Sequence, residues 1–219
     1  MPALTERDGV HVLHIGDGEN RFTLDWMKGI EDALDEVEAS PAPLVTVASG
    51  KHYSNGLDLE WVLANMGELQ AYAARVEALL GRVLTLGVPT AAGVSGHAFG
   101  AGAILAMAHD WRVMRSDRGY FCFPEVDIPL AFPPGLSMLV QAKLTPRAAT
   151  DAMITGHRFT APEALAAGIV DGIADEAAVL GDAIARVTPH AGKDPNTLES
   201  IKRRMYSDVI SKLSEGAHW

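Results

Sequence analysis

The 219-residue sequence contains one cysteine, Cys122, so the chain cannot form an internal disulfide. A lone thiol is typical of proteins from a reducing compartment. The first eight residues are polar and include Glu6 and Asp8, which does not fit a signal peptide or a transit peptide. The sequence also lacks any run of about 18 uninterrupted apolar residues, which a membrane helix needs. Together these absences predict a soluble, cytoplasmic protein with no membrane partner.

Positive charge is scarce as well. The chain has 18 Lys and Arg against 28 Asp and Glu, a net charge of −10 at pH 7. Nucleic acid needs a basic face on the protein, so we expect no nucleic-acid partner, although a few lysines or arginines could hold a phosphorylated small ligand. The eight histidines are scattered with no pair at metal-ligand spacing, so we expect no metal site. We expect His97 at a pocket edge and His109 at the surface.

Length and composition fit one globular domain, with 48% hydrophobic and 21% charged residues. Short apolar segments predict strands, and apolar residues at helical spacing predict helices. The strands are expected at residues 10–15, 44–48, 88–93, 111–114 and 120–124. The helices are expected after the N-cap Thr23, over 69–83 and 101–110, and from 134 onward near 136–140, 148–154, 161–168, 177–187 and 195–213. This alternation predicts an α/β fold with a largely parallel sheet and a helical C-terminal part.

A glycine-rich stretch lies at the centre of the chain. The strand that ends near Val94 is followed by Gly96, Gly100 and Gly102, and then by an apolar helix. Glycine allows positive φ and close approach to the backbone, and free amides at a helix N-terminus suit an anion or a developing oxyanion. Close packing of helix on sheet is the alternative explanation. The spacing departs from both the dinucleotide fingerprint and the nucleophile elbow of serine hydrolases.

Four segments, taken in order, resemble motifs of the enoyl-CoA hydratase/isomerase (crotonase) superfamily. Tyr53-Ser54-Asn55-Gly56-Leu57-Asp58 is similar to its Phe-Ser-x-Gly-x-Asp loop, and Ser95–Gly102 to its Asn-Gly-x-Ala-x-Gly-Gly-Gly segment. Phe123–Pro129 resembles its Phe-x-x-Pro-Glu-x-x-x-Gly segment. Thr155–Leu165 more weakly resembles its Thr-Gly-x-x-x-x-Ala-x-Glu-Ala helix entry. The resemblance covers the chain from its first strand to about residue 172.

The resemblance implies one crotonase-like domain over residues 1–219. Residues 1–145 would form a spiral of ββα turns, and about 146–219 a helical trimerisation region. It also implies an acyl-CoA substrate and a homotrimer or a dimer of trimers. CoA would be part of the substrate, and no metal or redox cofactor would be needed.

The resemblance further implies two backbone donors for the thioester oxygen, the amides of Leu57 and Ala101. Alanine at position 101, where the family has glycine, is tolerable if its φ is negative. The residues expected to line the acyl-CoA pocket are Ser54, Asn55, Gly56, Asp58 and Gly100. Among these, we expect Asp58 mainly to stabilise the loop.

Two positions decide the expected chemistry. Hydratases of the superfamily use two glutamates to hold a water, and this chain has Ile104 at the first position and Glu125 at the second. A lone glutamate can still move a proton from C2 to C4 of a 3-enoyl-CoA. The apolar neighbours of Glu125 would raise the pKa of its carboxyl and make it a better base. Asp127, two residues on, would face the same way in an extended segment, and we interpret it as structural or pocket-shaping.

The sequence therefore predicts a Δ3,Δ2-enoyl-CoA isomerase of fatty-acid β-oxidation that acts through Glu125. Another acyl-CoA enzyme of this fold, hydratase-like or thioesterase-like, is one alternative. A non-catalytic acyl-CoA-binding paralogue is the other.

Overall fold

Short apolar segments of the chain pair to form two β-sheets in the computed structural model, which describes residues 1–128 and 131–216. The larger sheet has the order β1 (Ala3–Arg7), β2 (Val10–His14), β3 (Leu44–Val47), β5 (Thr90–Val94), β7 (Trp111–Arg115) and β9 (Gly172–Ala174). The smaller has the order β4 (His52–Ser54), β6 (His97–Phe99) and β8 (Phe121–Cys122). All neighbouring strands are parallel except β1 and β2. The largely parallel sheet predicted from the sequence is confirmed.

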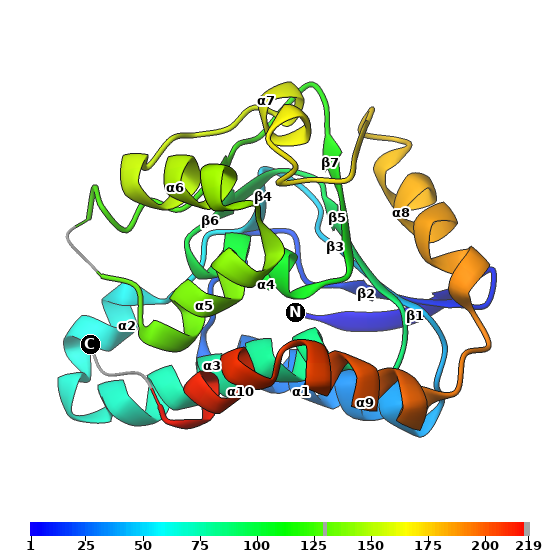
Figure 1. The fold of residues 1–219 in the computed structure, drawn as a ribbon, viewed down its shortest axis with the longest axis horizontal. Helices are drawn as coiled ribbons and strands as arrows, with labels where there is room; N and C mark the ends of the chain where they lie inside the picture. Colours follow the sequence, from blue (N-terminus) through cyan, green and yellow to red (C-terminus); the bar gives the residue numbers. More distant parts are fainter. Residues whose placement is uncertain (129–130, 217–219) are drawn as a thin grey trace.

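Ten α-helices of the described ranges connect and cover the sheets (Figure 1). They are α1 (Leu24–Ala39), α2 (Leu59–Ala64), α3 (Leu69–Thr85), α4 (Ala101–Ala108), α5 (Pro134–Lys143), α6 (Pro146–Thr155), α7 (Ala161–Ala166), α8 (Val179–Val187), α9 (Pro195–Met205) and α10 (Ser207–Ser214). Two short 3₁₀ turns lie at Met66–Glu68 and Thr188–His190. Within the part of the chain that the structure describes, none of these helices has the length and apolar character of a membrane span.

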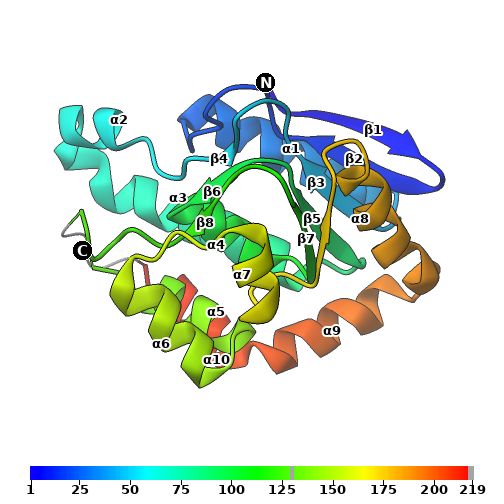
Figure 2. The ribbon, with the colours of Figure 1, turned by 90° about the horizontal axis from the view of Figure 1, so that it is seen from above.

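The chain winds as a spiral. Each of β3, β5 and β7 in the larger sheet is followed by one strand of the smaller sheet, β4, β6 and β8 respectively. Helices α2 and α3 complete the first turn and α4 completes the second. Figure 2 shows β6 and β8 side by side, next to β5 and β7 of the larger sheet. This is the crotonase-like ββα spiral, which the alternation of strands and helices alone did not separate from a doubly wound sheet.

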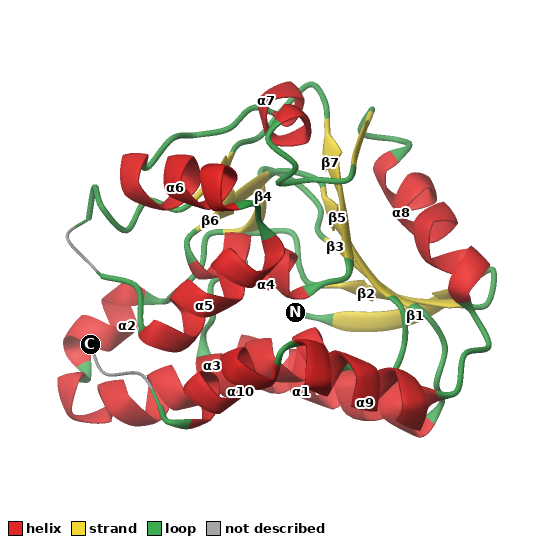
Figure 3. Ribbon diagram, in the orientation of Figure 1, coloured by secondary structure: helices red, strands yellow, loops and turns green. Residues whose placement is uncertain are grey.

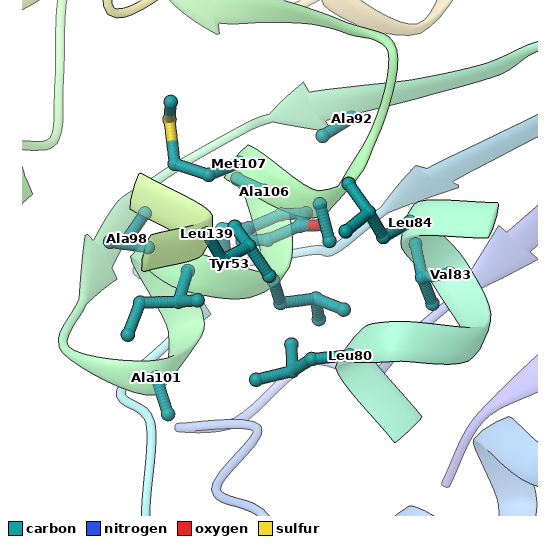
Figure 4. Close-up of a cluster of buried hydrophobic side chains, with 14 of the residues drawn as sticks. Tyr53, Leu80, Val83, Leu84, Ala92, Ala98, Ala101, Ala106, Met107 and Leu139 are labelled. Carbon is teal, nitrogen blue, oxygen red and sulfur yellow. The ribbon is translucent and has the colours of Figure 1, made fainter. Parts of the chain in front are cut away.

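Apolar side chains form a core on each face of the larger sheet. Helix α8 packs on one face, against β3, β5 and β7, while α4 covers the other face and also contacts β4 and β6. Figure 3 shows α8 on one side of the larger sheet and α1, α3, α9 and α10 gathered on the other. The close-up in Figure 4 shows the larger core, where Leu80 from α3, Ala106 from α4 and Leu139 from α5 meet around Tyr53.

Helix α1 shows how local sequence fixes an element. Its N-cap is Thr23, whose hydroxyl accepts a hydrogen bond from the Trp26 amide. The residues at helical spacing, Met27, Ile30 and Leu34 among them, are buried on one face. Both features confirm the prediction for this helix.

Four elements differ from expectation. Strand β1 pairs with β2 through a turn at Asp8 and Gly9, which both have positive φ, and Asp-Gly is a strong hairpin signal that the prediction did not use. Strand β4 lies in a polar segment for which no strand was predicted; it pairs with β6, and the side chain of its first residue, His52, is half-buried. Strand β9 adds to the sheet from within the region expected to be helical. The single helix expected over 195–213 is divided at Tyr206.

Candidate active site

The loop after β4 is held by hydrogen bonds to residues 19–22. The Ser54 hydroxyl donates to the Asn20 carbonyl (2.7 Å) and accepts from the Gly56 amide (3.2 Å). The Gly56 carbonyl accepts from the Phe22 amide, and the Asn55 amide donates to the Glu19 carbonyl. Ser54 is fully buried and its hydroxyl fixes the loop; its expected place in the lining of the acyl-CoA pocket, partly through backbone atoms, stays a prediction. Asn55 is half-buried.

Glycines let this loop meet the start of α4. Gly56 has φ +79°, and a Cβ atom on it would lie 2.9 Å from the Ala101 nitrogen. A Cβ atom on Gly102 would lie 2.3 Å from the Ser54 carbonyl oxygen. No side chain fits at either position, so glycine allows this close approach. The contact is between Gly56 and the Ala101 amide, and the Leu57 amide is the next one along the loop.

The two amides are available for a ligand. Among the described residues, neither the Leu57 nor the Ala101 amide donates a hydrogen bond. Ala101 is the first residue of α4, where an amide has no partner within the helix. Its φ is not positive, so alanine fits here in place of glycine. Gly100, just before it, has φ +52° and turns the chain into the helix.

Glu125 lies next to these donors. A Cβ atom on Gly100 would be 3.4 Å from Glu125 Oε1. The carboxylate therefore lies against the residue that directly precedes Ala101. The Glu125 side chain is buried, and its Oε2 has no hydrogen-bond partner among the described residues. Burial raises the pKa of this carboxyl to about 7. Phe123, fully buried two residues earlier, contributes to the apolar surroundings predicted from the sequence.

An apolar cavity of about 310 Å³ opens beside Leu57. It is lined by Leu57, Leu59, Val62, Leu63, Met66, Leu69, Tyr72 and Ile128. Tyr72 also supports the loop, because its hydroxyl donates to the Phe22 carbonyl (2.9 Å) and accepts from the Asp58 amide (3.0 Å). The sequence predicted only a helix over 69–83, without a role for Tyr72, and the apolar residues of 59–66 were the available signal for this cavity.

The remaining predicted residues lie as follows. Asp58 is the N-cap of α2 and accepts from the Trp61 amide, which is the loop-stabilising position expected for it. Ile104 is buried in the first turn of α4 and donates its amide to the Gly100 carbonyl. His97 is half-buried on β6, against the rings of His52, Phe99 and Tyr120.

Two expectations were wrong. Asp127 does not extend from Glu125, because its amide closes a turn onto the Pro124 carbonyl (2.9 Å) and its side chain is exposed near Gly156. His109 is fully buried rather than at the surface, and its ring bonds to Thr46 and to the Leu105 carbonyl. Burial lowers the pKa of His109 to about 4. Pro129, the last residue of the third motif, lies outside the described residues.

Comparison with known proteins assigns this arrangement to a family. The family model described as enoyl-CoA hydratase/isomerase matches residues 5–218. The chain is 37% identical over 185 residues to enoyl-CoA delta isomerase 2, peroxisomal, of Arabidopsis thaliana, covering 80% of this chain and 77% of that protein. It is 34% identical over 177 residues to enoyl-CoA delta isomerase 1, peroxisomal, of the same plant, covering 78% of this chain and 74% of that protein.

Solved structures agree on the fold. The human mitochondrial delta3-delta2-enoyl-CoA isomerase superposes with a TM-score of 0.88 at 20% identity, over 98% of this chain and 86% of that one. A probable enoyl-CoA hydratase from Mycobacterium tuberculosis H37Rv superposes with a TM-score of 0.90 at 24% identity, over 98% and 92%. Another structure of the same Mycobacterium protein is named for an enoyl-CoA isomerase, so at these identities the superpositions show the shared fold alone.

Proposed function

The chain belongs to the enoyl-CoA hydratase/isomerase family, and on that premise we propose that it is a Δ3,Δ2-enoyl-CoA isomerase. The observation that carries the proposal is a single buried carboxylate, Glu125, beside two free backbone amides. The names of the Arabidopsis relatives support the same activity.

In the proposed reaction the thioester oxygen of a 3-enoyl-CoA accepts hydrogen bonds from the Leu57 and Ala101 amides. Glu125 removes a proton from C2, and the negative charge moves to the oxygen as an enolate. The same carboxyl, now protonated, returns the proton at C4, and the double bond shifts to C2–C3. Donors that meet the charge as it develops each contribute a few kcal/mol, about 3 kcal/mol in measured cases. The Glu125 pKa of about 7 suits a base that must later act as an acid.

The apolar cavity beside Leu57 would take the acyl chain. The described residues that line it have no charged side chain, and it begins at the residue whose amide would hold the thioester oxygen. A chain bound there would leave C2 and C4 near Glu125. Asn55, Gly56 and Gly100 would contact the thioester end through backbone atoms.

A hydratase needs a second group to hold the attacking water, and Ile104 offers none. The side chain at this position is apolar and buried among core residues. Hydration by this chain, and a thioesterase-like or purely binding role, are therefore secondary to isomerisation in our proposal.

Incubation with 3-hexenoyl-CoA tests the function, followed by the ultraviolet absorbance of the conjugated 2-enoyl product. Wild-type protein should produce the absorbance, and Glu125→Gln should abolish it while hexanoyl-CoA binding stays nearly unchanged. Normal turnover by Glu125→Gln would refute the assignment of the base. Turnover of 2-hexenoyl-CoA to the 3-hydroxy product at a comparable rate would instead favour a hydratase.

We also propose a role in fatty-acid β-oxidation and a homotrimeric assembly. Two relatives are named as peroxisomal, and the cytoplasmic location expected for this chain stays a prediction.

A further inference from the structure

A second cavity, of about 390 Å³, lies at the opposite ends of the strands that lead to the candidate active site. It touches Pro89 and Trp111, where β5 and β7 begin, and its outer wall is α9. In Figure 1, α9 runs along the edge of the molecule and leads into α10, which packs against α5. None of its lining residues lines the cavity beside Leu57.

Three buried or half-buried cations surround this cavity, and two of them have a carboxylate partner. Lys202 Nζ donates to Asp110 Oδ2 (2.6 Å) and to the Val88 carbonyl (2.9 Å). Arg112 does not line the cavity; it follows the lining residue Trp111 in the chain and is paired with Asp171 (2.9 Å). These pairs neutralise two positive charges.

Lys143, at the end of α5, is the third cation. Among the described residues its ammonium has no carboxylate within 4 Å, and its hydrogen-bond partner there is the Tyr206 hydroxyl (3.2 Å). An ammonium has three N–H donors, so two remain for a ligand. A half-buried charge without a counter-ion is costly, and an anion in the cavity would supply the missing partner.

The rest of the cavity is suited to an apolar body. Leu198, Ile201 and Met205 lie on the same face of α9 as Lys202, at helical spacing. Trp111 forms the facing wall, with the ring of His190 stacked on it at 4.9 Å. An inorganic anion would leave these surfaces in contact with water.

We propose that this cavity is a binding site for a small organic carboxylate, whose head group pairs with Lys143 and whose apolar body lies between Trp111 and α9. A single carboxylate matches Lys143, the one half-buried cation there without a carboxylate partner among the described residues; Lys193, which also lines the cavity, is exposed to solvent. The site is separate from Glu125, so the proposal does not depend on the isomerase function.

Proton linkage gives a direct signature of this site. Burial, together with repulsion from Arg112 and Lys202, lowers the pKa of Lys143 to about 8. The other ionisable groups near it are Asp110, Asp171, Tyr206, His190 and Lys193. A bound carboxylate favours the charged ammonium and raises this pKa again. Binding should therefore take up protons at pH 9, where Lys143 is mostly neutral, and none at pH 6.5.

The test is calorimetric titration of the full-length protein with hexanoate in two buffers of different ionisation enthalpy. We expect proton uptake approaching one per ligand at pH 9, and hexanamide, the neutral analogue, should bind at least tenfold more weakly. Hexanoate binding without proton uptake at pH 9, or equal binding of hexanamide, would overturn the proposal. Inorganic phosphate that binds more tightly than hexanoate would overturn the assignment of an organic ligand.

Substitutions of single residues show in which cavity hexanoate binds. Lys143→Met should weaken hexanoate at least tenfold, since a hydrogen-bonded charge pair is lost, while Lys212→Met, an exposed lysine of α10, should not. Leu63→Glu, which places a negative charge at the exposed edge of the cavity beside Leu57, should bind hexanoate as the wild type does, which separates the two cavities. Unchanged affinity in Lys143→Met would refute the site. Proton uptake by the wild-type protein remains decisive if that variant does not fold.

Discussion

At the scale of single residues, the proposed reaction depends on one carboxyl, that of Glu125, whose pKa is raised by burial. Glu125 has to be ionised to remove a proton from carbon, and its pKa is about 7. A raised pKa means that the charged form is present only above about pH 7.

We therefore expect kcat/KM for 3-hexenoyl-CoA to fall about tenfold per pH unit below 7 and to level off above it. The measurement is initial rate between pH 5.5 and 8.5, with the protein's fold checked at each pH by circular dichroism. A rate that is flat across this range, or that falls as the pH rises through 7, would show that another group is the base.

A proline at position 101 would remove the Ala101 N–H and leave the other side chains of the site in place. Proline is tolerated at the first position of a helix, where its missing N–H had no helical partner, and its ring would occupy the space of the proposed oxyanion. We expect Ala101→Pro to lower kcat by about 100-fold to 1,000-fold, the typical cost of losing one oxyanion donor. Ala101→Gly keeps the amide and should retain activity within a fewfold. If Ala101→Pro folds and turns over normally, this amide is not a donor.

The motifs and the local chemistry named Glu125 and the two amides, and their roles in the site stay predictions. The structure places Gly56 against the Ala101 amide and Gly100 against the Glu125 carboxylate, because glycines allow these close approaches. The orientation of other side chains was predicted poorly. Asp127 failed because the prediction assumed an extended chain where the structure has a turn. The prediction of a surface position for His109 failed because a polar side chain can be buried when it has a buried hydrogen-bond partner, here the Thr46 hydroxyl.

At the scale of elements, the contact between the loop at 54–58 and helix α4 depends on two glycines, Gly56 and Gly102, which have no side chain to keep the two backbones apart. Gly102 makes this contact from within the helix, against the Ser54 carbonyl. A methyl group at 102 would force the helix and the loop apart, since backbone atoms cannot move aside as a flexible side chain can.

Gly102→Ala should therefore cost about 1–3 kcal/mol of unfolding free energy, typical of overpacking a core, and should reduce isomerisation by displacing Ala101 from Leu57. Gly181→Ala in α8 is the control, because a Cβ there meets nothing within 4 Å and alanine favours helix by up to about 1 kcal/mol. Urea denaturation of both variants and the 3-hexenoyl-CoA assay provide the measurements. Equal stability of the two variants would contradict the role of this contact.

The elements that the sequence predicted are those with a strong internal pattern. Helix α1 has a capping threonine and a regular apolar face, and both are visible in the sequence. Strand β9 is three residues long, half-buried at its start, and exists because β7 offers an edge. Such a strand is fixed by its partner and not by its own residues, so a local pattern does not find it.

At the scale of the whole molecule, the spiral arises from connections and not from composition. A strand of the larger sheet, a strand of the smaller sheet and a helix repeat in order, and the same alternation fits a doubly wound fold. Only the pairing of β6 with β4 and β8 in a sheet of their own, apart from β3 and β5, separates the two. The family motifs supplied this long-range information, because they belong to a fold already known.

The exposed surface of the fold bears on how many chains assemble. The C-terminal region, expected to mediate trimerisation, leaves large apolar side chains exposed in the single chain: Ile154 at the end of α6 is 66% exposed and Leu165 of α7 is 40% exposed. Exposed apolar side chains that gather on one region are typical of interfaces, because burying them against another chain removes them from water.

We therefore expect light scattering at micromolar concentration to give three times the chain mass of 23.3 kDa, or six times for a dimer of trimers. Ile154→Glu would place a charge in that interface and should shift the protein to monomer. Leu24→Glu is the matched control, since Leu24 is 39% exposed but lies at the start of α1, outside the C-terminal region, and should leave the mass unchanged. A wild-type mass of one chain would contradict the trimer. A mass unaffected by Ile154→Glu would place the interface elsewhere on the molecule.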